Sequence, residues 1–237
     1  MAQIKYILTA ICISAALTAN AQGTMTKKSA IQHITGEPFV FYYAMFDGVP
    51  FYRGDWLTGS VTMKSGETYN GLQLRYDDFK DDLIYQNNIT HSVIIIDKNS
   101  IAQFCLTLPN GKTETFKLIE HQSLKNLSGS YFAIILEDSL SVIKKYEAKE
   151  ERYSNVNMTL KKTGAFVQKE SRYTWDGNEL KAVPRFRRML LRQYPQHKDE
   201  LRKFFFHNHI RMKNDDDVRL LYQEINRMVK EDSKATN

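Results

Sequence analysis

Short runs rich in β-branched and aromatic residues alternate with turn sequences between residues 38 and 182. The dipeptide Asn110-Gly111 separates two such runs, and Asp176-Gly177 separates two others. Asn-Gly or Asp-Gly between strand-like runs is a strong short-range signal for a β-hairpin. Because successive hairpins place antiparallel strands side by side, this region is predicted to form an antiparallel β-sheet or a partly closed barrel.

Individual runs also indicate which way their side chains face. Residues 71–76 alternate between apolar and polar positions, as a strand with one buried face does. Residues 93–96 are a continuous apolar run, which predicts a strand buried on both faces. Cys105 lies in the strand-like run at residues 101–106, and we expect it to be a buried, unreactive thiol.

The spacing of apolar residues becomes helical from residue 183 onward. Pro184 stands where a proline at the first position of a helix belongs. A second helix is expected over residues 196–210. In a third, Asn214 and Asp215 can cap a run whose apolar residues recur every three to four positions. We therefore predict an α+β fold, in which a β-rich body is followed by a C-terminal bundle of about three short helices.

The first 21 residues have the layout of a cleavable secretory signal peptide. Lys5 precedes an uncharged apolar stretch from Tyr6 to Leu17. The small residues Ala19 and Ala21 occupy the two positions that a signal peptidase recognises before its cleavage site. A stretch of about a dozen residues is too short to span a bilayer, which needs about 20. We expect an exported protein, periplasmic, outer-membrane-associated or secreted, with no transmembrane segment after cleavage.

The predicted organisation has four parts. Residues 1–21 are the signal peptide, 22–37 a flexible polar leader, 38–182 the β-rich domain and 183–237 a basic helical region. Cleavage of the signal would leave Cys105 as the single cysteine. An internal disulfide could then not form, so the fold must rely on its hydrophobic core.

Several longer motifs are spread over residues 50 to 230. They are GSVTMKSGETYNGLQLRYD at residues 59–77, DLIY at 82–85, SVIKKY at 141–146 and YTWDGNELK at 173–181. Together with the helical tail, these motifs resemble a group of uncharacterised exported proteins common in Bacteroidota. The resemblance implies export and a β-rich body with a helical tail. It implies no activity and no catalytic residues.

The densest acidic cluster consists of Asp77, Asp78, Asp81 and Asp82. Four carboxylates close together could hold calcium or act as an acid and base in hydrolysis. Their spacing matches no calcium loop, and aspartate in a turn between strands is ordinary. The cluster supports one alternative function, a carboxylate-dependent hydrolase of envelope polymers.

Positive charge gathers in the helical region, where residues 183–237 hold 13 Lys or Arg against 8 Asp or Glu. The predicted basic helical face consists of Arg185, Arg187, Arg188, Arg192, Lys198, Arg202 and Lys203. Such a face attracts anionic surfaces. We expect its partner to be an anionic envelope component or an acidic protein, and export disfavours nucleic acid.

An aromatic run suggests a second alternative function, a small-ligand binder with an aromatic-lined β cavity. Its members are Phe39, Phe41, Tyr42, Tyr43, Phe46, Phe51 and Tyr52. Their alternation is equally typical of a half-buried strand.

Other residues give no recognisable catalytic or metal-binding pattern. His207 and His209 are two positions apart, whereas two zinc ligands on one helix face stand three or four apart. No phosphate-binding glycine loop and no nucleophile motif occurs in the sequence. We therefore expect no cofactor and no metal, and we favour a non-enzymatic binding or structural module of the cell envelope.

Overall fold

The computed structural model describes residues 34–120, 127–153 and 163–235. The second of the two units into which the chain divides, residues 36–237, is the one described below. The predicted signal peptide, and the predicted leader up to residue 33, lie outside the described residues. The sheet begins within the predicted leader, because Gly36 already pairs with Ile96.

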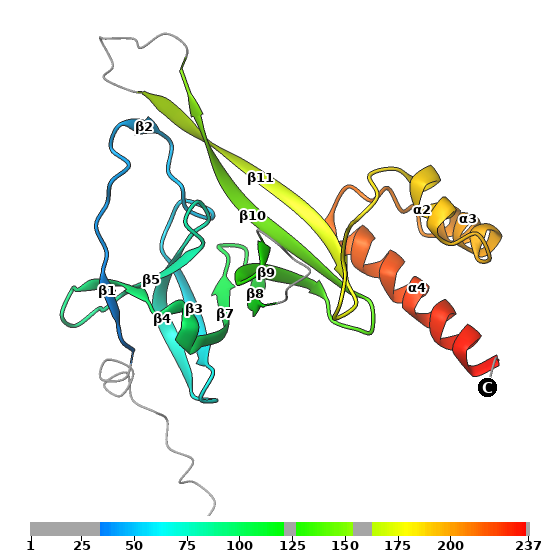
Figure 1. Cartoon of the computed structure of the whole chain (residues 1–237), viewed down its shortest axis with the longest axis horizontal. Coiled ribbons are helices and arrows are strands. Elements are labelled where there is room, and N and C mark those ends of the chain that lie inside the picture. Colours follow the sequence, from blue (N-terminus) through cyan, green and yellow to red (C-terminus); the bar gives the residue numbers. More distant parts are fainter. Residues whose placement is uncertain (1–33, 121–126, 154–162, 236–237) are drawn as a thin grey trace, which may run out of the picture. The chain divides into compact units, whose positions relative to one another are not determined.

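The β-rich region forms one twelve-stranded sheet in the described part of the chain. The strands are β1 (Gly36–Pro38), β2 (Phe46–Asp47), β3 (Leu57–Met63), β4 (Thr68–Asp77), β5 (Asp82–Gln86), β6 (Val93–Ile96), β7 (Ile101–Thr107), β8 (Thr113–Ile119), β9 (Ser130–Leu136), β10 (Ser141–Arg152), β11 (Gly164–Trp175) and β12 (Leu180–Ala182). Their order is β1-β6-β5-β4-β3-β7-β8-β9-β10-β11-β12, all antiparallel, and β2 pairs parallel to β11 (Figure 1). The sheet is open, and with the helices that follow it the predicted α+β class is confirmed.

Glycine turns join strands at both positions that the sequence indicates. Between β7 and β8, the backbone N–H of Leu108 donates to the carbonyl of Lys112 at 2.8 Å, and Gly111 has a φ of 79°. Between β11 and β12, Gly177 has a φ of 93°. Glycine adopts these left-handed conformations without a Cβ clash. Both predicted hairpins are therefore confirmed.

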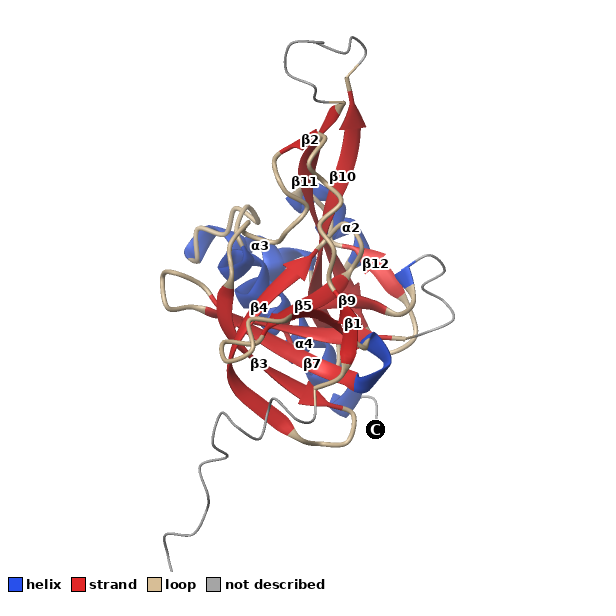
Figure 2. Cartoon of the chain, turned by 90° about the vertical axis from the view of Figure 1, so that its left-hand side faces the viewer, coloured by secondary structure: helices blue, strands red, loops and turns tan. Residues whose placement is uncertain are grey.

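The sheet curls so that β4 approaches β10, although β3, β7, β8 and β9 separate them in the strand order (Figure 2). The backbone N–H of Ala148 on β10 donates to the carbonyl of Asp78, just beyond β4, at 3.1 Å. Aromatic rings from several strands fill the curl. Phe104 and Phe116 stack with centroids 4.7 Å apart, and Tyr76 lies 5.3 Å from Phe116. All three side chains are buried, so this aromatic cluster forms the core of the curled sheet.

Strand β6 differs from the sequence-based expectation. Among its four residues only Ile96 is buried, and the other three are partly exposed. The strand lies next to β1, a three-residue strand at the edge of the sheet. Because little of the sheet continues past β6, its run of apolar residues is covered less than a central strand would be. The prediction that residues 93–96 are buried on both faces is therefore wrong.

Three helices follow the sheet in the described part of the chain, and a short 3-10 turn precedes β7. The helices are α2 (Arg187–Gln193), α3 (Lys198–His207) and α4 (Asp215–Ala235), and the 3-10 turn is η1 (Lys98–Ser100). Pro184 does not begin a helix, because Val183 is still bonded through its N–H to the carbonyl of Arg172 on β11. Phe186 is also extended, with a φ of −124°. The predicted helix start at Pro184 is wrong, since the sheet holds the chain extended up to that point.

Helix α4 packs its apolar face against β9 and β10. As predicted, Asn214 caps this helix, because its Oδ1 accepts the backbone N–H of Asp217 at 2.7 Å. The buried side chains of α4 and the sheet residues that they join are Val218, Leu221, Tyr222, Ile225, Met228, Ile135 and Val142. This second hydrophobic cluster also holds Leu190 of α2 and Leu201 of α3, so the tail and the sheet share one core.

Candidate functional site

Asp81, one of the four predicted acidic residues, lies at the centre of a largely buried network. Its carboxylate accepts hydrogen bonds from Tyr76 Oη and Lys98 Nζ, each at 2.5 Å, and from Lys145 Nζ. It also accepts the backbone N–H of Tyr131 at 3.2 Å. Burial lowers the pKa of Lys145, and the charge of Asp81 opposes that shift. The negative charge of Asp81 thus compensates the positive charge of Lys145, which is only 6% exposed.

Asp77 and Asp78 are also buried, but they face other partners. Asp77 accepts from Tyr43 Oη at 3.0 Å and from the backbone N–H of Lys80 at 2.9 Å, which holds the turn in place. Asp78 accepts from Gln168 Nε2 at 3.4 Å, and its Oδ2 has no hydrogen-bond partner in the described structure. Burial raises the pKa of Asp78 to about 7.

The fourth residue, Asp82, is partly buried, and burial raises its pKa, as does the nearby charge of Asp77. The structure therefore brings the four aspartates into one turn but gives Asp77, Asp78 and Asp81 separate partners. None of the four lines the concavity described below. The arrangement stabilises the turn between β4 and β5.

The pKa of Asp78 predicts how stability changes with pH. An aspartate in the unfolded chain loses its proton at about pH 3.9, whereas Asp78 in the folded protein keeps it up to about pH 7. Between these values the folded state binds more protons, so this carboxyl makes stability fall as pH rises. We expect Asp78→Asn to raise the urea midpoint more at about pH 8 than at about pH 5.

Asp199→Asn is the matched control, because that carboxyl is 85% exposed on α3. It should shift the urea midpoint little at either pH. Equal shifts for Asp78→Asn at both pH values would contradict the assignment of a raised pKa to this residue.

A second lysine, Lys144, is buried next to Lys145 on β10 and is 4% exposed. Its Nζ contacts the carboxylate of Asp215 in the first turn of α4, and Arg172 Nε of β11 donates to the same carboxylate at 2.7 Å. Burial raises the pKa of Asp215, but the hydrogen bonds from Lys144 and Arg172 outweigh it and lower the pKa overall. These ion pairs hold the start of α4 on the sheet.

Most of the predicted basic face is exposed on and around α2 and α3. Five of its cations are exposed and take part in none of the ion pairs formed within the described ranges. They are Arg185, Arg188, Arg192, Lys198 and Lys203. Unpaired cations on a surface remain available for an external anion.

The two remaining members of the predicted face have partners within the protein. Arg187 donates to the carbonyl of Ile210 and lies 4.9 Å above the ring of Phe205. Arg202 pairs with Asp199 at 3.2 Å on the exposed side of α3. Arg187 therefore links α2 to α3 and the loop that follows it, while the charge of Arg202 is partly compensated.

Large apolar side chains are exposed among these cations. Phe186 is 67% exposed, Met189 51% and Phe206 75%. Met189 stands three positions before Arg192 on α2, and Phe206 three positions after Lys203 on α3, so each pair shares a side of its helix. We call these three apolar residues and the five unpaired cations the basic–apolar face. The sequence predicts the charges of this face but not its apolar members, because apolar residues at helical spacing usually indicate a core.

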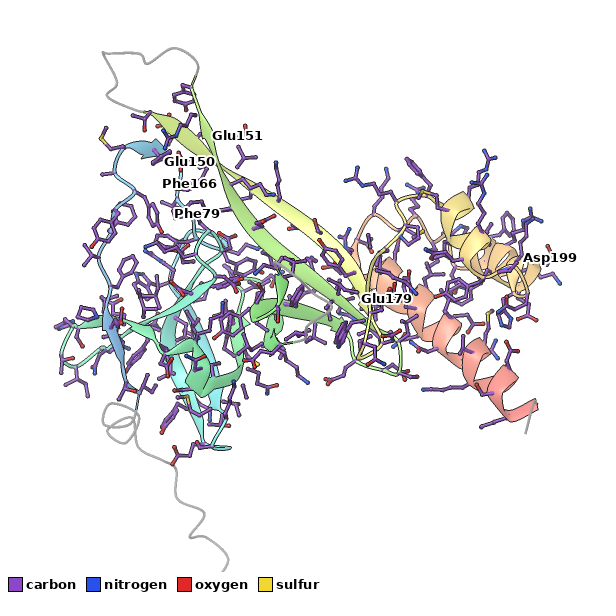
Figure 3. The ribbon with its side chains drawn as sticks, viewed as in Figure 1. Phe79, Glu150, Glu151, Phe166, Glu179 and Asp199 are labelled. Atoms are coloured by element: carbon purple, nitrogen blue, oxygen red, sulfur yellow. The ribbon has the colours of Figure 1, made fainter. Side chains whose placement is uncertain are left out.

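The aromatic run at residues 39–52 is mostly a loop, so it does not form the half-buried strand that its alternation equally allowed. Only β2 within it is a strand, and β2 pairs with the start of β11. Tyr43 is buried and packs 5.4 Å from Phe166, whereas Tyr42 is 69% exposed. Phe79, from the β4–β5 turn, lies 5.3 Å from Phe166 (Figure 3). The run covers β11 by ring packing instead of extending the sheet.

A concavity of about 330 Å³ opens where this aromatic run ends. It is lined by Val49, Phe51, Tyr52, Arg53, Gly54, Tyr146, Gln168 and Glu170. Ligand sites usually measure roughly 300 to 1,000 Å³, so the concavity is large enough for a small molecule. Of the predicted aromatic residues, Phe51 and Tyr52 form part of its wall.

The described residues contain no group of three or more His, Cys, Asp or Glu placed to hold a metal ion. Within the same ranges, no helix is both long enough and apolar enough to cross a membrane. Comparison of the chain with protein-family models, with curated proteins and with solved structures finds no match.

Proposed function

We propose that this protein is an exported, non-enzymatic binding module of the cell envelope, and that its basic–apolar face docks on an anionic phospholipid surface. The observation that carries the proposal is the combination of five unpaired cations with three exposed large apolar side chains on two adjacent helices and the segment just before α2. Cations attract anionic headgroups, and aromatic or apolar side chains enter the interface between headgroups and acyl chains.

The inner sides of α2 and α3 are anchored in the hydrophobic core. Leu190 of α2 and Leu201 of α3 are fully buried in the cluster that α4 forms with the sheet. Their opposite sides can therefore meet a surface without the helices unfolding. A partner that is an acidic protein would use the same cations, but it would not need a lipid bilayer.

Flotation with vesicles tests the proposal directly. The purified protein is expected to float with vesicles that contain phosphatidylglycerol and to remain unbound with pure phosphatidylcholine. Each Lys or Arg near an anionic membrane contributes about 1 kcal/mol. Reversing Arg188 and Arg192 to glutamate should therefore weaken binding by roughly 30-fold or more, and added salt should weaken it further.

Lys149→Glu with Lys169→Glu is the matched control, because it reverses the same number of charges on exposed positions of β10 and β11. This pair should bind nearly as well as the wild type. Equal losses for both double variants would mean that only net charge matters, and no binding to anionic vesicles would exclude the lipid surface. Binding to an acidic protein without vesicles would favour the other partner class.

The alternative of a carboxylate-dependent hydrolase receives no support from the geometry of Asp77 to Asp82. Their contacts explain them as groups that hold a turn and compensate a buried lysine. Converting Asp77 and Asp82 to asparagine would test that alternative on any envelope polymer that the protein is found to cleave.

A further inference from the structure

A second concavity, of about 370 Å³, lies where β11 meets the start of the helical tail. Strand β11, the segment that follows β12 and the loop before α4 form its walls. Its lining combines the buried residues Pro184, Met212 and Val218 with the cations Arg172, Arg185 and Lys213. We call it the β11–α4 concavity. Its volume falls within the range of roughly 300 to 1,000 Å³ that is usual for ligand sites.

Arg172 of β11 holds both loops of this concavity. Its carbonyl accepts the backbone N–H of Val183 at 2.9 Å, which positions the segment that leads to Arg185. Its Nε donates to Asp215 at 2.7 Å, and its Nη2 donates to the carbonyl of Lys213 at 3.4 Å. The backbone segments that carry Arg185 and Lys213 are therefore both attached to Arg172, by contacts that need no ligand.

The three cations of the concavity have donors that the protein does not use. The side chains of Arg185 and Lys213 are exposed, and neither forms a hydrogen bond or an ion pair in the parts of the chain that the structure describes. Nη1 of Arg172 also has no acceptor among those residues. Because Nη1 is not one of the buried atoms that lack a partner, it is open to solvent. Free N–H groups on cations form strong hydrogen bonds with an anion.

The charges around the concavity do not balance. The lining and its ion-pair partners contain four cations but only two carboxylates. Glu170, the acidic residue of the lining, pairs with Lys144 at 3.6 Å. Asp215 pairs with Arg172 at 2.7 Å and also contacts Lys144. Arg185 and Lys213 remain without a counter-charge, so the concavity favours a ligand with about two negative charges.

A phosphate monoester matches this requirement. At neutral pH it carries a charge of about −1.5 to −2, and it presents three strong acceptor oxygens. A carboxylate or a phosphodiester carries only one negative charge. Three oxygens can accept from Arg172, Arg185 and Lys213 together, and the apolar part of the lining provides surface for the carbon atoms of the ester.

We propose that the β11–α4 concavity binds a phosphate monoester, with its phosphoryl oxygens bonded to Arg172, Arg185 and Lys213. This site goes beyond docking on a membrane, because it recognises one chemical group, whereas the basic–apolar face responds to surface charge. Soluble phosphate esters and the headgroup of phosphatidic acid both carry this group. Arg185 belongs to both sites, but Lys213 belongs to the concavity alone, which allows separate tests.

The test is a titration of the purified protein at low ionic strength, followed by NMR, with glycerol 3-phosphate as the probe. It should saturate the site with a dissociation constant on the order of 1 mM. Glycerol and acetate should bind at least about 10-fold more weakly, because neither supplies two charges. Lys213→Gln removes one of the donors and should weaken glycerol 3-phosphate about 10-fold. Since this side chain is unpaired within the described ranges, the urea midpoint should not change.

Lys203→Gln is the matched control. It removes the same charge from an exposed, unpaired cation on α3 that does not line the concavity. This variant should bind glycerol 3-phosphate as tightly as the wild type. The proposal is overturned if glycerol 3-phosphate does not saturate, if glycerol or acetate binds as tightly, or if the two substitutions weaken binding equally.

Flotation with vesicles of matched surface charge identifies the source of the ligand. If it is a lipid headgroup, the protein should prefer phosphatidic acid, a monoester, over phosphatidylglycerol, a diester, and Lys213→Gln should abolish that preference. If both vesicles bind equally while glycerol 3-phosphate saturates, the ligand is a soluble phosphate ester. Lys213→Gln should leave flotation with phosphatidylglycerol unchanged, so this proposal and the proposed membrane docking fail separately.

Discussion

Replacing Asp81 by asparagine is expected to lower the free energy of unfolding by roughly 3–5 kcal/mol. The substitution preserves the shape of the side chain, and asparagine tolerates the φ of 64° that Asp81 adopts. It removes the negative charge that faces Lys145, whose side chain is 7% exposed. An ammonium group left buried without a counter-charge is strongly destabilising. Urea unfolding, followed by tryptophan fluorescence, measures the loss.

The double variant Asp81→Asn with Lys145→Met separates this charge effect from other causes. Methionine removes the buried charge and keeps most of the side-chain volume, so it should recover much of the lost stability. Asp199→Asn, on an 85% exposed carboxylate, should cost less than about 1 kcal/mol. If Asp81→Asn unfolds at the wild-type urea concentration, the network around Asp81 does not stabilise the fold.

Leu221→Ala should destabilise the protein by about 2–5 kcal/mol. Leu221 is fully buried on the side of α4 that joins Ile135 and Val142 of the sheet. Truncation leaves a cavity that the packed surroundings cannot fill. Because the cluster also holds parts of α2 and α3, the loss should appear in the main unfolding transition, and not as a separate early transition of the tail.

Leu220→Ala provides a control at the adjacent position. Leu220 is 41% exposed on the same helix, and its substitution changes the same atoms. It should cost less than about 1 kcal/mol, because little apolar surface is lost from the core. Similar losses for the two variants would mean that α4 does not pack on the sheet through the face described here.

Local sequence signals are sufficient to predict most of the fold. The two glycine turns, the alternation in β4 and the cap at Asn214 each depend on residues close together in the chain, so the sequence predicts them. The failures occur where a distant segment decides the outcome. The hydrogen bond from Val183 to Arg172 holds the chain extended just before Pro184, and β6 is only partly covered because of its position near the edge of the sheet.

The candidate sites show the same division. The basic residues of the tail could be read from the sequence, but their division into paired and unpaired cations could not. Arg187 donates to the carbonyl of Ile210, whereas Arg188, next to it in the chain, forms no ion pair within the described ranges. The aromatic run contributes only Phe51 and Tyr52 to the concavity at its end. Gln168 and Tyr146, which complete it, come from other strands and carry no local signal.

The sequence by itself determined that this chain forms consecutive antiparallel hairpins followed by amphipathic helices, because turn chemistry and apolar spacing act over a few residues. Only the tertiary structure decided where two neighbouring lysines, Lys144 and Lys145, would find their counter-charges. Lys144 forms an ion pair with Asp215 at the start of α4, and Lys145 forms one with Asp81 in the turn between β4 and β5. Adjacent residues in a strand face opposite sides, and charges taken out of water must be paired. Which carboxylate pairs with which lysine depends on the curl and on the docking of α4, and both arise from contacts between distant parts of the chain.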